Sequence, residues 1–418
     1  MTALPQYDLS PPPAAAARSG PAAARSAPAA PDVGVPFAAA RLTPEALAGA
    51  ERVLRSGWLT TGPEVASFEA EFAALVGTRN AVAVASCTAG LELSLRALDL
   101  PPGARVLLSS VTFVGALHAV VHSGLVPVLA DVDPVTAMPT PESTAAAAHR
   151  CGGVAAMMVV HLYGDAAPVP ALAEAAGLPL HAVVEDAAHA LGTTVRGRPV
   201  GGLSRASAFS FYATKNLPIG EGGMVSTDDD ALAGVLRRTR LHGMSHDAWR
   251  RYLPGGGWRY DVDRPGLKAN MTDLQAAIGR GQLTAFGDWQ RRRATIAARY
   301  DEQLGGLPGL ALPHRPSRAG HAWHIYAVRV EPGARLHRDE LATRLAERGV
   351  GTSVHFVPLH HLRYGAAVTG LRAGALPGAD LVAGQLLSLP MHPWLCDADV
   401  DRVCDLVHEL VGGRGRPA

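Results

Sequence analysis

Three short segments of the 418-residue sequence carry side chains that could do chemistry together. The first, Ser-Cys-Thr-Ala-Gly at 86–90, offers a hydroxyl and backbone N–H groups at the start of a predicted helix, a typical anion site for a phosphate. The second ends an apolar run with Asp186, which needs a donor or cationic partner if it is buried. The third places Lys215 five residues after Ser210 and ahead of Gly-Glu-Gly-Gly at 220–223, a setting in which a lysine can form a Schiff base with a carbonyl.

Each segment has an ordinary structural interpretation when it is taken alone. Thr88 could simply cap a helix, Asp186 could form a salt bridge, and Lys215 could lie at the surface. Together, a phosphate anchor, a buried carboxylate and a lysine are the parts that a pyridoxal 5'-phosphate (PLP) site requires. The sequence therefore predicts a PLP site at the carboxyl edge of a sheet, where open α/β sheets bind ligands.

The elements that would position these segments alternate between strands and helices from about residue 35 to past residue 230. Leu91, Leu95 and Leu98 are spaced i, i+4 and i+7, which predicts a helix after the first strand. This alternation indicates an α/β fold with a mostly parallel sheet. Apolar runs predict its strands at 81–86, 105–110, 125–133, 154–164, 179–190 and 207–216.

The pattern changes after residue 275 to longer helical stretches. Further strands are predicted at 321–330 and 352–359, and a closing helix at 397–410. We therefore expect a large PLP-binding domain and a small C-terminal α+β domain, preceded by an Ala- and Pro-rich tail that is disordered because it lacks bulky apolar side chains. The predicted boundaries are 1–34 for the tail, 35–290 for the large domain and 291–418 for the small one.

Composition and charge narrow the class of protein. With 48% apolar and 18% charged residues the chain can bury a sizeable core, and 38 basic against 37 acidic residues leave no surplus for binding nucleic acid or an anionic membrane. No apolar run approaches the roughly 18 residues of a membrane span. The four cysteines, Cys87, Cys151, Cys396 and Cys404, have neither zinc nor disulfide spacing, so we expect a cytoplasmic protein without a metal site.

Two further features have both a chemical and an ordinary interpretation. Cys87 is expected to pack between strand and helix and not to act as a nucleophile, since no acid–base pair lies beside it in the sequence. The histidines at 355, 360 and 361 could suggest a metal. If their segment is a strand, however, the adjacent His360 and His361 diverge, which favours substrate contact or surface exposure for His355, His360 and His361.

Motifs along most of the chain resemble those of the DegT family of nucleotide-sugar aminotransferases. The resemblance runs from about residue 38 to about 410, with the motifs in the family's order and spacing. It implies the fold-type I PLP-dependent transferase fold, like that of aspartate aminotransferase, and a homodimer with active sites at the interface. The segments that carry it include SGWLTTGPEVASFEAEFAALVG, SCTAGLELSL, VVEDAAHALGTTVRGRPVG, FSFYATKNLPIGEGGMVSTDD, GLKANMTDLQAAIGRGQL, HAWHIYAVRV, GTSVHFVPLHHL and LSLPMHP.

The resemblance also implies roles for single residues. Lys215 resembles the lysine that binds the cofactor's aldehyde and shuttles the α proton of the amino donor. Asp186 resembles the partner of the pyridinium nitrogen, and His189 lies where relatives place a side chain near the phenolic oxygen. The other implied cofactor contacts are Thr88, Ala89 and Ser210 at the phosphate and Phe113 stacked on the ring.

The segment 266–273 resembles one that reaches the phosphate of the neighbouring subunit, usually through an asparagine. Here Lys268 and Asn270 both lie in that segment, and which of them makes the contact is left open. The Lys-x-Asn pattern, the aromatic segment 258–261, and HAWH followed by VHF are most similar to the branch that aminates C4 of 4-keto sugars.

The implied activity is transfer of an amino group from an amino acid, expected to be L-glutamate, to a keto group of a nucleotide-activated sugar, at C4. The Ala-rich, Arg-over-Lys composition is compatible with a role in natural-product deoxyaminosugar biosynthesis. Alternatives are a ketocyclitol aminotransferase, a PLP-dependent sugar dehydratase or a non-catalytic relative. Lys215 argues against the dehydratase, whose relatives carry histidine there, and the intact lysine, aspartate and phosphate motif argue against the non-catalytic relative.

Overall fold

A seven-stranded sheet forms the centre of the computed structural model, which describes residues 34–245, 260–314 and 320–412. The strand order is β1-β9-β8-β5-β4-β2-β3, and β9 runs antiparallel to both neighbours while the remaining pairs are parallel. The prediction of a mostly parallel α/β sheet is confirmed. The strands are β1 (Asn80–Val84), β2 (Arg105–Ser109), β3 (Val126–Ala130), β4 (Ala156–Val160), β5 (Val183–Asp186), β8 (Ala206–Ser210) and β9 (Gly223–Thr227).

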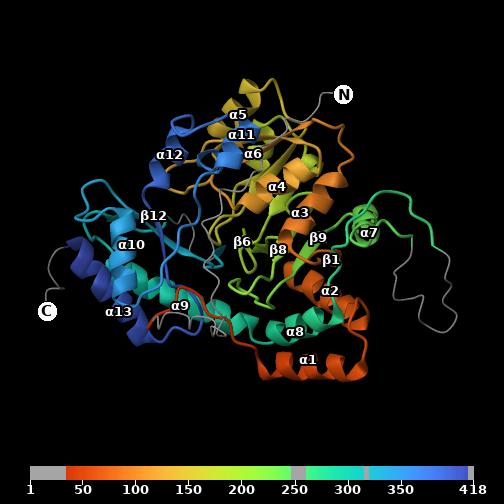
Figure 1. The fold of residues 1–418 in the computed structure, drawn as a ribbon, viewed down its shortest axis with the longest axis horizontal. Helices are drawn as coiled ribbons and strands as arrows, with labels where there is room; N and C mark the ends of the chain where they lie inside the picture. The colour runs from red at the N-terminus through yellow and green to blue at the C-terminus, as the bar shows by residue number, and fades with distance from the viewer. Residues whose placement is uncertain (1–33, 246–259, 315–319, 413–418) are drawn as a thin grey trace, which may run out of the picture.

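Helices cover this sheet (Figure 1). Alternating strand residues pack against different helices. Val82 joins the apolar cluster that contains Leu91 of α3, whereas the next residue, Ala83, joins the cluster that contains Phe68 and Phe72 of α2. Both faces of the sheet are therefore buried, which explains the nearly continuous apolar runs of its strands. The helices are α1 (Pro44–Ser56), α2 (Pro63–Val76), α3 (Cys87–Arg96), α4 (Val114–His122), α5 (Pro141–Arg150), α6 (Val169–Ala175), α7 (Asp230–Thr239) and α8 (Asp273–Leu283), with the turn η1 (Leu180–Ala182) and the hairpin β6 (Thr194–Val195) and β7 (Arg198–Pro199).

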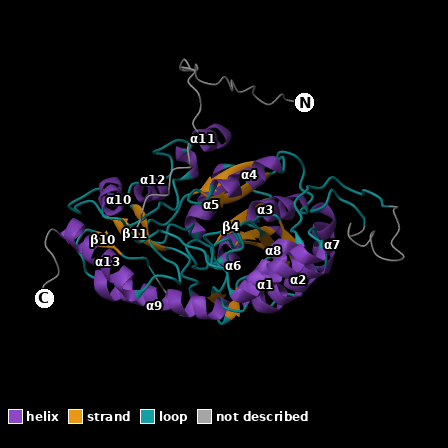
Figure 2. Cartoon of the chain, turned by 60° about the horizontal axis from the view of Figure 1, so that its bottom comes forward, coloured by secondary structure: helices purple, strands orange, loops and turns teal. Residues whose placement is uncertain are grey.

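A smaller antiparallel sheet lies at the other end of the molecule (Figure 2). Its order is β10-β11-β12, and its core includes Tyr326, Leu387 and Val400. This arrangement confirms the expected small C-terminal α+β part. Its elements are α9 (Phe286–Leu304), β10 (Leu310–Ala311), β11 (Tyr326–Val330), α10 (Arg338–Glu347), η4 (Leu359–His361), α11 (Arg363–Thr369), α12 (Pro377–Ala383), β12 (Leu386–Leu389), α13 (Asp397–Val407) and η5 (His408–Gly412).

Helix α9 joins the two parts. Phe286 at its start packs in the cluster of α2, and Tyr300 near its end packs in the cluster of the small sheet. Between them, the buried Arg293 donates from Nη1 to the carbonyls of Trp323 at 3.1 Å and Met391 at 2.8 Å. The predicted division at residue 290 falls within α9, and the domain boundaries stay a prediction.

The segment 352–359 differs from its prediction as a strand. Only Ser353 pairs there, in an isolated bridge with Ser388, because Pro358 has no N–H for a ladder and the N–H of Leu359 donates to the Ser110 carbonyl at 2.8 Å. His361 follows in the 3₁₀ turn η4, where successive residues are rotated by about 120° and not by the 180° of a strand. The expected divergence of the two adjacent histidines is therefore wrong.

Some predictions fall on parts of the chain that the structure leaves undescribed. The predicted tail lies outside the described residues apart from residue 34, as do residues 258 and 259 of the aromatic segment. None of the helices in the described ranges combines the length and the apolar character that crossing a bilayer requires.

Candidate active site

A cavity of about 480 Å³ opens at the carboxyl ends of β1, β2, β4, β5 and β8. Its wall also includes His324, His355 and Phe356 from the C-terminal part, so residues far apart in the sequence meet there. Ala89, Lys268 and Asn270 do not line it. The predicted residues that do are Thr88, Phe113, Asp186, His189, Ser210 and Lys215.

Lys215 stands in a tight turn after β8. Its N–H donates to the Tyr212 carbonyl at 2.8 Å, and Gly220 closes the turn with φ of 97°, a left-handed conformation that favours glycine. The side chain is partly buried and lines the cavity. Desolvation lowers the pKa of the Lys215 amine to about 8, although the charges of Asp186 and Cys87 oppose this.

Asp186, at the end of β5, is 6% exposed. Burial raises the pKa of its carboxyl, and the N–H of Ala188, at 3.0 Å from Oδ1, and the charge of Lys215 counteract the rise. The thiol of Cys87 lies 3.8 Å from Oδ1, a weak contact. Burial also raises the pKa of Cys87 well above its usual value, which makes the thiol a poor nucleophile and agrees with its expected packing role.

Three histidines surround the lysine. Burial holds the pKa of His189 and of His324 well below the usual value and lowers that of His355 to about 4, and in each case the positive charge of Lys215 adds to the effect. Nδ1 of His189 accepts the N–H of Tyr163 at 3.2 Å, so the hydrogen of this neutral ring lies on Nε2. The cavity therefore places the neutral imidazoles of His189, His324 and His355 on the same wall as the amine of Lys215 and the buried carboxyl of Asp186.

The start of α3 forms part of the cavity wall. Ser86 caps the helix by accepting the N–H of Ala89 at 3.1 Å, which occupies that N–H and leaves Thr88 on the cavity wall. A side chain at Gly223 of β9 would place its Cβ 2.6 Å from the nitrogen of Cys87, and one at Gly115 would lie 2.7 Å from Oγ1 of Thr88. Glycines thus keep space open around a helix N-terminus, where a phosphate fits.

The other predicted cofactor contacts differ in position, since Phe113 lies at the cavity wall and Lys268 and Asn270 do not. Phe113 is 57% exposed at the cavity wall and lies 5.9 Å, between ring centroids, from Phe356. Lys268 contacts Oδ1 of Asn270, whose amide donates to Oγ1 of Thr61 at 2.8 Å. These two side chains lie outside the cavity of their own chain.

Sequence reasoning missed the position of His324 beside His189, with ring centroids 4.4 Å apart. Nδ1 of His324 lies 2.9 Å from Oδ1 of Asn216, the residue after Lys215, while the Asn216 amide donates to the Ala322 carbonyl at 2.8 Å. The signals in the sequence were that His324 lies within the segment 321–330, which is predicted as a strand, and within the HAWH motif. Neither signal indicates which cavity the ring enters.

Known proteins resemble this chain over most of its length. The model of the DegT/DnrJ/EryC1/StrS aminotransferase family matches residues 41–408. The spore coat polysaccharide biosynthesis protein SpsC of Bacillus subtilis (strain 168) is 42% identical over 381 residues, covering 91% of this chain and 97% of SpsC.

Solved structures agree with this match. The aminotransferase TlmJ from Streptoalloteichus hindustanus is 36% identical, with a TM-score of 0.79 over 89% of this chain and 97% of TlmJ. Spr1654 from Streptococcus pneumoniae, assigned as a sugar aminotransferase, is 27% identical in its PLP-form, with a TM-score of 0.81 over 90% of this chain and 99% of Spr1654. A PMP-form of Spr1654 matches as well.

Proposed function

Because the chain belongs to the DegT/DnrJ/EryC1/StrS aminotransferase family, we propose that it aminates C4 of a 4-keto nucleotide sugar with L-glutamate as amino donor. It is a PLP-dependent sugar aminotransferase. What we propose in addition is the carbon that is aminated, the nucleotide-bound form of the sugar and the identity of the amino donor. The observation that carries the proposal is Lys215, a desolvated amine with a pKa of about 8 in a cavity that also holds the buried Asp186. The free thiols of Cys87 and Cys151 support the proposal of a cytoplasmic location.

The residues present fit PLP. Thr88 and the start of α3 suit the phosphate, Ser210 lies on the same cavity wall, and Gly115 leaves the space that a side chain would fill. Asp186 suits the ring nitrogen because a buried carboxylate stabilises a proton there. When bound, the cofactor supplies an aldehyde and a ring that withdraws electrons from the α carbon of the amino donor.

The chain's own groups then hold and move protons. Lys215 is neutral in an appreciable fraction of molecules near pH 8, so its Nζ can attack a carbonyl, and once released it can take and return the α proton of the donor. His189 presents an Nε2–H that can donate to the cofactor's phenolic oxygen. Phe113, with its exposed ring, can cover the cofactor face.

Turnover with defined sugars tests the proposal. The 4-keto products of TDP-, UDP- and GDP-sugar dehydratases are offered with L-glutamate, and formation of the amino sugar is followed by mass spectrometry. The matched control is Lys215→Ala, which should bind cofactor without a covalent link and give no product. Borohydride reduction and peptide mapping should place the pyridoxyl group on Lys215, and a label on another lysine would contradict its role.

The alternatives differ in their outcome. If the enzyme aminates a ketocyclitol and none of the keto sugars, it is a ketocyclitol aminotransferase, the first alternative. Loss of a sugar hydroxyl without amination would support the dehydratase. Absence of any cofactor absorbance in purified protein would support the non-catalytic relative.

We also propose a homodimer in which each subunit completes the partner's site. Lys268 and Asn270 contact each other but do not line the cavity of their own chain, which agrees with a contact to the phosphate held by a second copy. Cofactor binding would then favour association by mass action.

Mixing two inactive variants tests this sharing. A hybrid of Lys215→Ala with the Lys268→Ala, Asn270→Ala double variant would contain one site with both intact parts and one site with neither. Activity recovered on mixing supports the shared site. If native mass spectrometry detects hybrids but activity does not return, the segment acts within its own subunit.

A further inference from the structure

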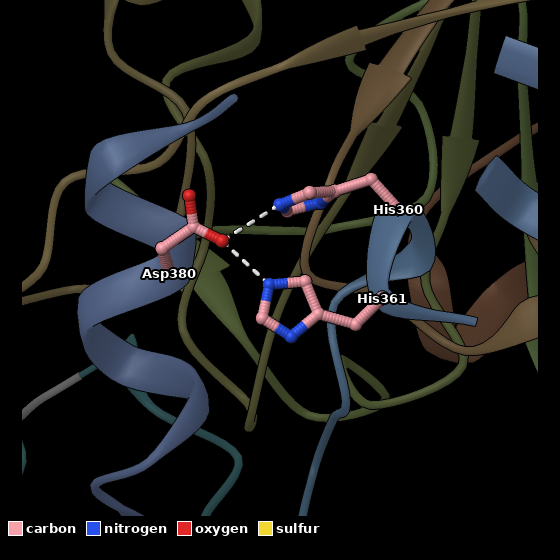
Figure 3. Close-up of side chains that lie close together, drawn as sticks. All are labelled: His360, His361 and Asp380. Carbon is pink, nitrogen blue, oxygen red and sulfur yellow. Dashed lines mark hydrogen bonds and ion pairs between the residues drawn. The ribbon is translucent and has the colours of Figure 1, made fainter. Parts of the chain in front are cut away.

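Two adjacent histidines and an aspartate converge at a place separate from the PLP cavity (Figure 3). His360 and His361 belong to the turn η4, and Asp380 belongs to α12. One potential ligand atom from each residue lies within 4.8 Å of the others, and among the described residues this is the one such group of three. None of the three lines the cavity around Lys215.

Both imidazole rings contact the same carboxylate oxygen of Asp380. Nε2 of His360 lies 3.0 Å from Oδ1 of Asp380, and Nε2 of His361 contacts the same oxygen. The other oxygen, Oδ2, accepts the N–H groups of Gly374 at 2.9 Å and Leu376 at 3.2 Å. Two backbone donors thus orient the carboxylate so that Oδ1 faces the imidazoles, and ligating carboxylates in metal sites are likewise held by hydrogen bonds.

The turn that carries the histidines is fixed in place. Leu359 donates its N–H to the Ser110 carbonyl at 2.8 Å, and α11 packs so closely that a Cβ at Gly365 would lie 1.9 Å from the Leu359 carbonyl oxygen. The two rings therefore project from a rigid support. Rigid placement of ligands reduces the entropy cost of binding an ion.

Access and charge also suit a cation. The side chain of His360 is fully buried, whereas His361 and Asp380 keep 23% and 20% of their side-chain surface exposed, so an ion can enter from solvent and keep a water ligand. The carboxylate of Asp131, which accepts the N–H groups at the start of α12, adds negative charge nearby.

We propose that His360, His361 and Asp380 bind a divalent transition-metal ion, Zn²⁺ in preference, with two imidazoles, one carboxylate and water as ligands. Imidazole nitrogen with carboxylate oxygen is a donor set that Zn²⁺ and its neighbours in the first transition row accept, whereas Mg²⁺ and Ca²⁺ prefer oxygen alone. The ion would bind Nε2 of both rings, and the hydrogen of each neutral imidazole would then lie on Nδ1. Nδ1 of His360 is buried without a hydrogen-bond partner, so the ligand lacks outer support and we expect micromolar affinity.

The bound ion would tie η4 to α12. His355 and Phe356, which line the cavity, lie only a few residues before His360. The proposed ion thus has a structural role, holding the end of a segment that forms part of the active-site wall.

Titration of the full-length, PLP-saturated enzyme with Co²⁺ tests the site. PLP saturation keeps the cavity histidines covered, and Co²⁺ reports nitrogen ligation by its visible absorbance. We expect one saturable Co²⁺ per chain, displacement by Zn²⁺, no competition from Mg²⁺, and a rise in melting temperature with Zn²⁺. His361→Ala should weaken Co²⁺ binding at least tenfold.

A matched control removes another histidine pair. His118 and His122 lie one turn apart on α4 with ring centroids 5.7 Å apart, and they do not belong to the group of three potential ligands. The His118→Ala, His122→Ala variant should keep the saturable binding and the thermal shift. Should His361→Ala fail to fold, as judged by its cofactor absorbance, His361→Gln keeps a polar contact to Asp380 and serves instead. Absent binding in the parent enzyme, or equal binding in the His361 variant, would overturn the proposal.

Discussion

Two adjacent carboxylates of β5 are held in opposite ways. Glu185, fully buried, lies 2.7 Å from Nε2 of His161 and accepts the hydroxyls of Ser204 at 2.7 Å and Ser207 at 3.0 Å. Asp186 accepts one backbone N–H and a weak thiol contact, and the rest of its acceptor capacity faces the cavity. Alternation along the strand sends them to opposite faces of the sheet.

The difference separates a structural carboxylate from a reactive one. A carboxylate has roughly four acceptor positions, and those of Glu185 are largely taken by protein donors. Nδ1 of His161 accepts the N–H of Ala167 at 3.1 Å, which leaves the Nε2 hydrogen for Glu185. Asp186 keeps free acceptor capacity in a desolvated setting, and such a group is ready to hold a cationic ligand atom.

The largest expected effect comes from Asp186→Ala. Removing the carboxylate at the cavity should lower turnover on the order of 10²–10³-fold, because the charge that stabilises a ring proton is lost. Thermal unfolding should change little, since burial already disfavours this charge. Steady-state kinetics and calorimetry on the same preparation measure the two effects, and near-normal turnover would exclude the role of Asp186.

Glu185→Ala should give the reverse pattern. It leaves His161, Ser204 and Ser207 without their acceptor, so we expect the free energy of unfolding to fall by about 3 kcal/mol. Turnover per folded molecule should stay within a few-fold of the parent. Denaturant unfolding with activity normalised to bound cofactor tests this, and a large kinetic defect without destabilisation would erase the contrast with Asp186.

The free energy of unfolding of the cofactor-free protein should depend on pH through Lys215, which faces the same cavity as Asp186. Lys215 has a pKa of about 8 when folded, against an ordinary 10.5, so between these values the unfolded chain binds a proton that the folded chain does not. Stability contributed by this group therefore rises with pH across that window. Lys215→Met should be more stable than the parent below pH 8 by about 3 kcal/mol, and the excess should shrink towards pH 10.5. Denaturant unfolding at several pH values measures this difference, and a stability difference that does not change with pH would contradict the lowered pKa of Lys215.

The smallest effect is expected from Cys87→Ala. The thiol is a weak donor to Asp186, and its loss leaves a small cavity, so stability should fall by about 1 kcal/mol and turnover by less than tenfold. Cys87→Ser is the matched control that keeps a donor. Loss of activity comparable to that of Asp186→Ala would mean that the thiol takes part in catalysis.

The sequence predicts the part of the site that lies at parallel strand ends. Thr88, Asp186 and Lys215 each follow an apolar run, and β1, β5 and β8 run in the same direction, so their carboxyl ends share one edge of the sheet and local patterns suffice. His324 and His355 come from the C-terminal part, whose placement depends on packing along α9 that no local pattern specifies. The segment 352–359 has the composition of a strand, but the missing N–H of Pro358 and the carbonyl of Ser110 favour a different course.

Arg293 has a consequence for how the molecule melts. Its guanidinium links the middle of α9 to the carbonyl of Trp323, before β11, and to that of Met391, after β12. Desolvation lowers the pKa of Arg293 to about 9. Unfolding of either α9 or the small sheet would therefore break these hydrogen bonds. The same helix inserts Phe286 into one apolar cluster and Tyr300 into another. The small sheet therefore cannot detach without disturbing the helix that the large sheet also needs. Heating should give one cooperative calorimetric transition instead of two, with the active-site wall lost in the same event as the core.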